Sequence, residues 1–213
     1  MASRFNLSKH LLMENRNCLL GFCLLFLTAQ AAAQFRIGVQ AGASVPGGSR
    51  YSTQMPYYFG GTMRVETTGS GGLVFGLFTL PRLNNRIYLR PSADLAFRGF
   101  KKTQIPPQAP SYSYTDGHSY LDLAFPVVYN FSNKPGGFYG GGGPGLSFLL
   151  SNQYGSTQVR STTVGLNGLL SYVFPLDFSL NASYHLGLTN ALLNSTDGSF
   201  KNSFFNITIG YLF

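Results

Sequence analysis

Apolar and polar residues alternate along most of the chain after residue 34, in segments of about ten residues. The last segment is the clearest, with large apolar residues at every second position: Phe205, Ile207, Ile209, Tyr211 and Phe213. A period of two residues is typical of β-strands that are buried on one face only. The pattern predicts about eight strands, at residues 35–44, 71–80, 87–99, 119–131, 137–149, 162–174, 177–188 and 203–213.

A soluble β-sandwich would also alternate, but the connections favour a closed membrane barrel. Long polar connections follow the odd strands, at residues 45–70, 100–118, 150–161 and 189–202, and tight turns follow the even strands. Outer-membrane barrels have this asymmetry, because their periplasmic turns are short and their external loops are long. We therefore expect an all-β fold, a membrane β-barrel of antiparallel up-and-down strands in the outer membrane. The rule places both termini of the mature chain in the periplasm.

The polar faces of the strands carry glycine and small residues, as the interior of a narrow barrel requires. The facing of the second and fifth strands stays open, because both of their faces are apolar or rich in glycine. The glycine run at 140–143 lacks the Lys-Ser/Thr and the helix of a phosphate loop, so we expect it to let the strand bend.

The first 33 residues are typical of a signal peptide. Basic residues precede an apolar run at 18–29, which at about twelve residues is too short to span a bilayer comfortably. Small residues then predict cleavage before Gln34, or alternatively before Ala32. The alternative to a signal peptide is that the segment is kept as an N-terminal membrane anchor. Residues 34–213 would form the barrel domain. Both cysteines lie in the segment to be removed, which suits an oxidising compartment.

Composition agrees with a barrel and argues against two other classes. Charged residues make up 10% of the chain and hydrophobic residues 44%, yet the mean hydropathy is only +0.06. A helical membrane protein would be more apolar. The net charge is +8, but the basic residues are scattered singly, so we expect no nucleic-acid partner.

Four segments together resemble the PorT-like outer-membrane β-barrel family. They are residues 120–131 (YLDLAFPVVYNF), 138–150 (FYGGGGPGLSFLL), 184–190 (YHLGLTN) and 210–213 (GYLF). Asp122 stands where the family pattern has Glu. The resemblance implies a fold and a location, but no single activity and no catalytic residues. The final strand, which ends on Phe213, also resembles the signal read by the barrel-assembly machinery, a partner that we therefore expect.

Five charged residues are expected to face the lumen: Arg36, Arg90, Asp94, Arg98 and Asp122. Burial of charges demands pairing, so we expect a charge network that plugs the narrow barrel. A gated pore lined by these charges is the alternative. Acid–base catalysis by Asp94 and Asp122 is disfavoured, because a substrate would hardly reach them.

The sequence offers little for enzymatic chemistry. Ser183 and His185 point the same way on one strand, but strand geometry separates them by roughly seven ångströms, too far for a hydrogen bond. His118 lies beside Asp116 at a predicted loop–strand junction. Two separated histidines without cysteine make no zinc ligand set. We expect no catalytic activity, no cofactor and no metal.

The external loops are the candidate binding surface. Its residues are Tyr51, Tyr57, Tyr58, Lys101, Lys102, Tyr112 and Tyr114. Exposed aromatic residues with basic neighbours suit an unidentified extracellular or periplasmic protein partner, and equally a rim against outer-membrane lipid and lipopolysaccharide. The predicted function is a non-catalytic barrel with a structural or surface-interaction role. Alternatives are a narrow pore or a PorT-like component of a secretion or transport system, and then a lipid-modifying enzyme.

Overall fold

The computed structural model describes residues 36–47, 50–57, 60–107, 109–132, 136–152, 160–190 and 201–213, so the predicted signal peptide lies outside it. The strands are β1 (Ile37–Pro46), β2 (Arg50–Pro56), β3 (Thr62–Thr79), β4 (Ile87–Leu89), β5 (Ser92–Ile105), β6 (Tyr112–Ala124), β7 (Val127–Asn130), β8 (Gly137–Asn152), β9 (Thr162–Val173), β10 (Phe178–Gly187) and β11 (Phe204–Leu212). No helix among these residues is long and apolar enough to cross a membrane.

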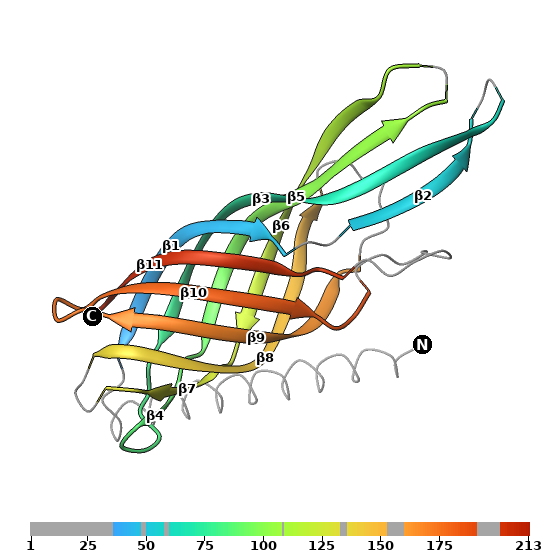
Figure 1. Ribbon diagram of the computed structural model, residues 1–213. Helices are drawn as coiled ribbons and strands as arrows, with labels where there is room; N and C mark the ends of the chain where they lie inside the picture. Colours follow the sequence, from blue (N-terminus) through green and yellow to red (C-terminus); the bar gives the residue numbers. More distant parts are fainter. Residues whose placement is uncertain are drawn as a thin grey trace, which may run out of the picture. The chain divides into compact units, whose positions relative to one another are not determined.

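Eight of the strands close into a ring (Figure 1). The order is β8, β6, β5, β3, β1, β11, β10 and β9, and β9 pairs back with β8. All of these neighbours are antiparallel. The short strands β4 and β7 pair with each other. Pro91 separates β4 from β5 and Pro126 separates β6 from β7, and neither proline can donate a ladder hydrogen bond. The predicted all-β, up-and-down barrel is therefore confirmed.

Burial alternates along the barrel strands, with polar side chains inside and apolar side chains outside. In β1, Gln40 and Ser44 are buried while Val39 and Val45 are exposed. The two faces that the sequence left open are now assigned. Val74 of β3 points inward, and Tyr139 of β8 does the same. The outer surface thus forms an apolar belt, which includes Leu73, Phe75, Leu77, Leu95, Phe97, Leu166, Leu170, Leu180, Ile207 and Ile209.

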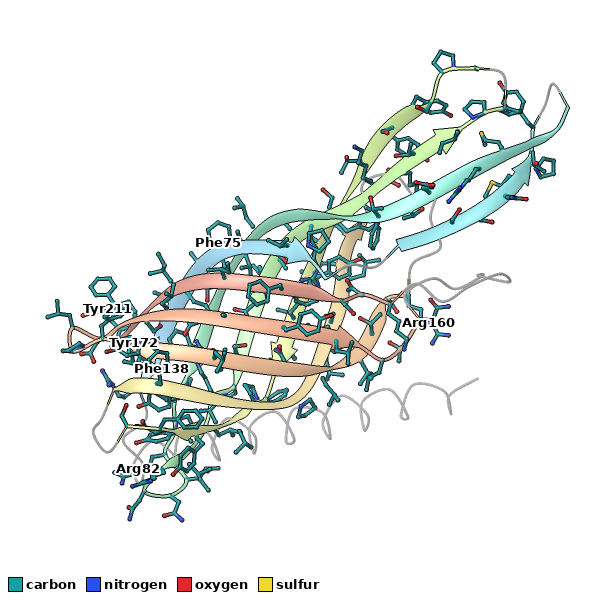
Figure 2. The ribbon with its side chains drawn as sticks, viewed as in Figure 1. Phe75, Arg82, Phe138, Arg160, Tyr172 and Tyr211 are labelled. Carbon is teal, nitrogen blue, oxygen red and sulfur yellow. The ribbon has the colours of Figure 1, made fainter. Side chains whose placement is uncertain are left out.

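An aromatic girdle lies at the end of the barrel that carries the tight turns, along strands β7 to β11. Figure 2 shows Phe138, Tyr172 and Tyr211 near that end. Ring pairs in edge contact are Tyr129–Phe131, Phe138–Tyr172, Tyr172–Phe174, Phe178–Tyr211 and Tyr211–Phe213, with centroids 4.7–5.3 Å apart. Such girdles are typical of the interface between membrane and water.

The other end of the barrel departs from the prediction. Residues 45–70 and 100–118 were expected to be polar loops, but most of them continue as paired strands. We call the four-stranded sheet of β2, residues 62–70 of β3, residues 99–105 of β5 and residues 112–117 of β6 the extension (Figure 1). The loop prediction was wrong because polarity was taken as a loop signal. Threonine and tyrosine favour strands even where both faces meet water.

The extension reverses the polarity of the barrel. Direct cross-strand partners share a face, so its inner face carries Met55, Met63, Val65, Thr67, Lys102, Gln104, Tyr112, Tyr114 and Asp116. Its outer face carries Ser52, Arg64, Glu66, Thr68, Lys101, Thr103 and Ser113. A bulge between Ser70 and Leu73 inserts one residue into β3 relative to β5 and switches the face of β3. The apolar outer surface therefore ends near Phe97.

Candidate functional site

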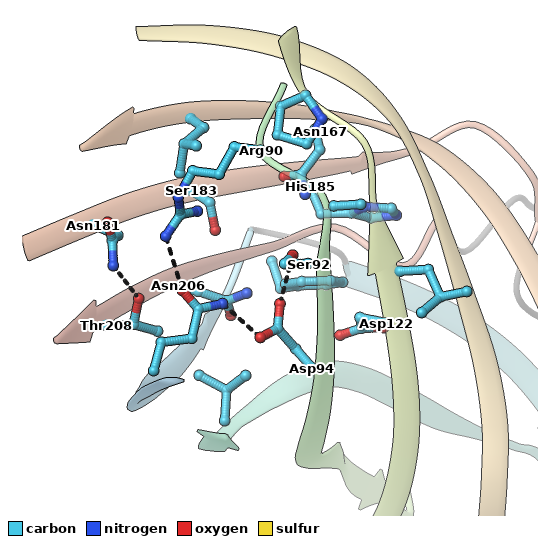
Figure 3. Close-up of a pocket in the computed structure, with 17 residues that line it drawn as sticks. Arg90, Ser92, Asp94, Asp122, Asn167, Asn181, Ser183, His185, Asn206 and Thr208 are labelled. Carbon is cyan, nitrogen blue, oxygen red and sulfur yellow. Dashed lines mark hydrogen bonds between the residues drawn. The ribbon is translucent and has the colours of Figure 1, made fainter. Parts of the chain in front are cut away.

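The lumen holds a hydrogen-bonded polar network nearest to the tight turns (Figure 3). The Arg90 guanidinium donates to Gln40 Oε1 at 3.0 Å, and Gln40 Nε2 donates to Asp94 Oδ1 at 2.5 Å. The Ser92 hydroxyl donates to the second oxygen of Asp94 at 3.0 Å. The guanidinium also lies 4.2 Å from the centre of the Phe78 ring. Gln40 thus separates a buried cation from a buried anion and hydrogen-bonds to both.

A second set of residues closes the middle of the lumen, and we call it the plug: Arg98, Tyr120, Asp122, His185 and Phe204. Arg98 donates two hydrogen bonds to the Asp122 carboxylate, at 2.7 and 3.0 Å. Its guanidinium lies 3.5 Å from the centre of the Phe204 ring and 4.7 Å from that of Tyr120. The His185 ring stacks on Phe204 at 4.7 Å.

Neutral side chains fill the wall between β9, β10 and β11. Asn181 accepts from the Ser171 hydroxyl at 2.6 Å and donates to Ser179 and Thr208 at 3.3 and 3.2 Å. All four side chains are buried. Short polar residues therefore satisfy one another where the barrel is narrow, as buried polar groups must.

The plug separates two small cavities. The lower cavity lies toward the tight turns, and its lining includes Gln40, Arg90, Asp94, Asp122 and His185. The upper cavity lies toward the extension, and its lining includes Ser44, Arg98, Tyr120 and Asn202. Phe204 lines both. Each offers about 20 Å³ to the centre of a water-sized sphere, which is room for about one water molecule. The described lumen is thus nearly filled by side chains.

Four of the five charges expected in the lumen are brought inside it: Arg90, Asp94, Arg98 and Asp122 are all buried. Arg36 lies apart, with its side chain about one-third exposed, and forms an ion pair with Asp177 in the β9–β10 turn. Gln40, which joins Arg90 and Asp94, was not among the residues predicted to form the network, because only charges were considered. Sequence reasoning also missed the rings of His185 and Phe204 against Arg98, because spacing along a strand does not report contacts across a barrel.

The residues expected on loops lie mainly on the extension. Tyr112 and Tyr114 stack with centroids 6.5 Å apart and are 54% and 39% exposed. Lys101 is exposed on the opposite face, whereas Lys102 forms a 2.9 Å ion pair with buried Asp116. Tyr57 follows the end of β2. Tyr58 and the side chain of Tyr51 lie outside the described residues.

The described residues contain no group of three or more His, Cys, Asp or Glu side chains that could hold a metal ion. His118, which the sequence placed at a loop–strand junction, is buried within β6. Its ring contacts Phe100 at 5.0 Å and Tyr120 at 6.2 Å, and its Nδ1 lies 3.2 Å from the Asp116 carbonyl oxygen. These contacts make it part of the packing at the upper end of the lumen.

Comparison with known proteins supports the fold. No family model matches the sequence, and no curated protein matches it significantly. Among solved structures, the outer membrane protein OprG from Pseudomonas aeruginosa is similar, at 13% sequence identity and a TM-score of 0.54. The match covers 84% of this chain and 95% of that one. At this identity the likeness is one of fold: the chain has the β-barrel architecture of an outer-membrane protein.

Proposed function

We propose that the protein is a non-catalytic outer-membrane barrel that presents the inner face of its extension to a partner, while the plug keeps its lumen closed. The observation that carries this proposal is the reversal of polarity beyond Phe97. Below that level the outer surface is apolar, as lipid requires, and the charged side chains of the described strands outside the extension, Asp94, Arg98 and Asp122, are buried in the lumen. Above it, the outer face is polar and the inner face carries methionine and tyrosine.

The location and orientation can be tested by thiol labelling in cells. Lys101→Cys places a thiol on the outer face of the extension, and Asn85→Cys places one in the exposed turn between Pro81 and Ile87. A membrane-impermeant maleimide should label position 101 on intact cells and position 85 only after permeabilisation. The unmodified chain controls for its two native cysteines. Labelling at 85 but not at 101 on intact cells would reverse the orientation, and label found only in soluble fractions would refute the membrane location.

The binding role rests on the exposed aromatic pair at the inner face. Tyr112 points to that face and its neighbour Ser113 to the opposite one, where Ser113 contacts Thr103 at 2.9 Å. A photo-crosslinking amino acid at position 112 should capture a specific protein on intact cells, and the same residue at position 113 should not. Equal capture from the two positions would argue against a binding face. Crosslinks to lipopolysaccharide alone, from both positions, would favour a lipid rim.

A narrow pore is the second candidate, favoured by the two cavities that flank the plug. The closed state predicts no steady conductance when the purified barrel is inserted into a planar bilayer. A stable single-channel current in the unmodified protein would favour the pore.

The PorT-like resemblance is retained as a proposal of family and of a role in a secretion or transport assembly. It is supported by the sequence motifs at 120–131 and 184–190, which form the β6–β7 wall and the end of β10. Loss of secretion of a surface protein on deletion of the gene, restored by the unmodified chain but not by a chain lacking the extension, would support that role. Unchanged secretion after deletion of the gene would refute a role in secretion.

A further inference from the structure

The upper cavity contains an unusual set of side chains that can donate hydrogen bonds. Arg98 Nε, Asn202 Nδ2, Ser44 Oγ and Tyr120 Oη are all buried, and each lacks a hydrogen-bond partner among the described residues. Their side chains are at least nine-tenths buried. Buried polar groups without partners are costly and rare, so four around one cavity indicate an occupant.

The two cavities differ in chemistry although each offers about the same room to a water molecule. In the lower cavity two of the unpartnered atoms are amide oxygens, of Asn167 and Asn206, and Asp94 and Asp122 lie in its wall. In the upper cavity the unpartnered atoms can all donate. Arg98 and Lys201 both lie in its wall, and none of its described lining residues carries a carboxylate.

Arg98 creates this difference. Both of its terminal nitrogens donate to Asp122, which lines the lower cavity only. Its Nε has no hydrogen-bond partner among the described residues, and Arg98 also lines the upper cavity. The guanidinium therefore satisfies a protein carboxylate on one side and carries an unused donor and part of its positive charge on the other.

We propose that the upper cavity binds one small monovalent anion of about the size of a halide. One water molecule could accept from Arg98 Nε and Asn202 Nδ2 and donate to the two hydroxyl oxygens, but the hydroxyl hydrogens of Ser44 and Tyr120 would then have no acceptor. An anion accepts from all four donors, and hydrogen bonds to a charged acceptor are the stronger kind. The space available excludes a solvated or polyatomic ligand much larger than a water molecule. The site does not depend on the binding role of the extension.

Bromide is a direct probe of this site. Crystals of the full chain, refolded in detergent and grown in about 150 mM sodium bromide, should give an anomalous peak at the bromine edge beside Asn202 Nδ2 and Tyr120 Oη. The proposal also predicts that the thermal midpoint rises saturably with chloride or bromide but not with gluconate at the same ionic strength, because a ligand of the folded state stabilises it.

Two variants and one control make the test specific. Asn202→Asp places a carboxylate of the same size against the anion, and Tyr120→Phe removes one donor. Each should weaken bromide affinity about tenfold or more, since each loses a hydrogen bond to a charged group. Thr163→Val removes another buried hydroxyl without a partner, one that is outside the lining of this cavity, and should leave the affinity unchanged.

Mobility shifts on boiling would verify that each variant folds. The proposal is overturned if the cavity holds water without anomalous signal at this bromide concentration. It is equally overturned if halide and gluconate give the same thermal midpoint, or if Asn202→Asp binds bromide as well as the unmodified protein. These results for the anion site do not bear on the membrane location or the binding face, because thiol labelling and photo-crosslinking test those separately.

Discussion

Asp94 of β5 and Asp122 of β6 lie directly opposite each other in the strand register, and both carboxylates point into the lumen. Like charges in direct cross-strand positions destabilise a sheet. Each carboxylate is held by a different neighbour: Asp94 by Gln40 and Ser92, and Asp122 by Arg98 from four residues further along β5. The two acidic residues thus belong to separate hydrogen-bond networks, and the plug begins where Arg98 reaches back to Asp122.

The first prediction concerns the Arg98–Asp122 pair. Asp122→Asn should lower the free energy of unfolding by about 3–5 kcal/mol, because it leaves a buried guanidinium without its counter-charge. Asp94→Asn should cost less, since an amide still bonds Gln40 and the repulsion with Asp122 is removed. Urea titration in liposomes, followed by gel mobility, measures both.

A double variant separates charge pairing from packing. Arg98→Met combined with Asp122→Leu removes both charges together and should recover most of the stability lost in Asp122→Asn, because a buried pair can be replaced by apolar residues at little cost. If Asp122→Asn alone is as stable as the unmodified protein, the ion pair does not hold the plug together.

Gly165 is predicted to leave the space that the His185 ring occupies. A Cβ atom at this position would lie 2.4 Å from His185 Nε2 and 2.6 Å from the Leu186 carbonyl oxygen, so the ring and the backbone would both have to move. We expect Gly165→Ala to cost about 1–3 kcal/mol. Gly168→Ala on the same strand is the control, since no atom lies within 4 Å of its added Cβ. Comparable losses in the two variants would contradict this explanation.

The apolar belt predicts a depth-dependent penalty for charge. Leu170 is 61% exposed on the outer wall of β9. Leu170→Arg should lower stability in phospholipid vesicles by about 2–4 kcal/mol, as for a charge near the middle of a bilayer. Thr103→Arg, on the polar outer face of the extension, should change stability by less than about 0.5 kcal/mol. A neutral effect of Leu170→Arg in vesicles would argue against lipid contact at this wall.

The β9–β10 turn provides the fourth prediction. Asp177 has a φ of +64°, in the left-handed region that asparagine and aspartate tolerate better than other side chains. Its ion pair with Arg36 is partly exposed and should contribute little. Asp177→Asn should therefore be nearly neutral, and Asp177→Ala should cost about 1 kcal/mol more. Equal losses would show that the charge matters more than the backbone.

The alternation of long and short connections determined the antiparallel up-and-down order. The period of two residues determined the eight strands of the ring and the inward direction of Arg90, Asp94, Arg98 and Asp122. It could do so because a side chain on a strand has only two directions, and lipid and lumen demand opposite polarities from them. The aromatic girdle was predictable for the same reason, since Tyr and Phe recur at the turn ends of successive strands.

Only the tertiary structure decided where the membrane-facing pattern stops and which side chains meet inside. The extension was hidden because its strands are polar enough to resemble loops, and because one inserted residue between Ser70 and Leu73 exchanges the faces of β3. The contact of Phe204 with Arg98 and His185 depends on curling strands that are distant in sequence around one narrow lumen. Alternation fixes the face of a residue, but the register and closure of the barrel select its neighbours, and the plug and the anion cavity are made of those neighbours.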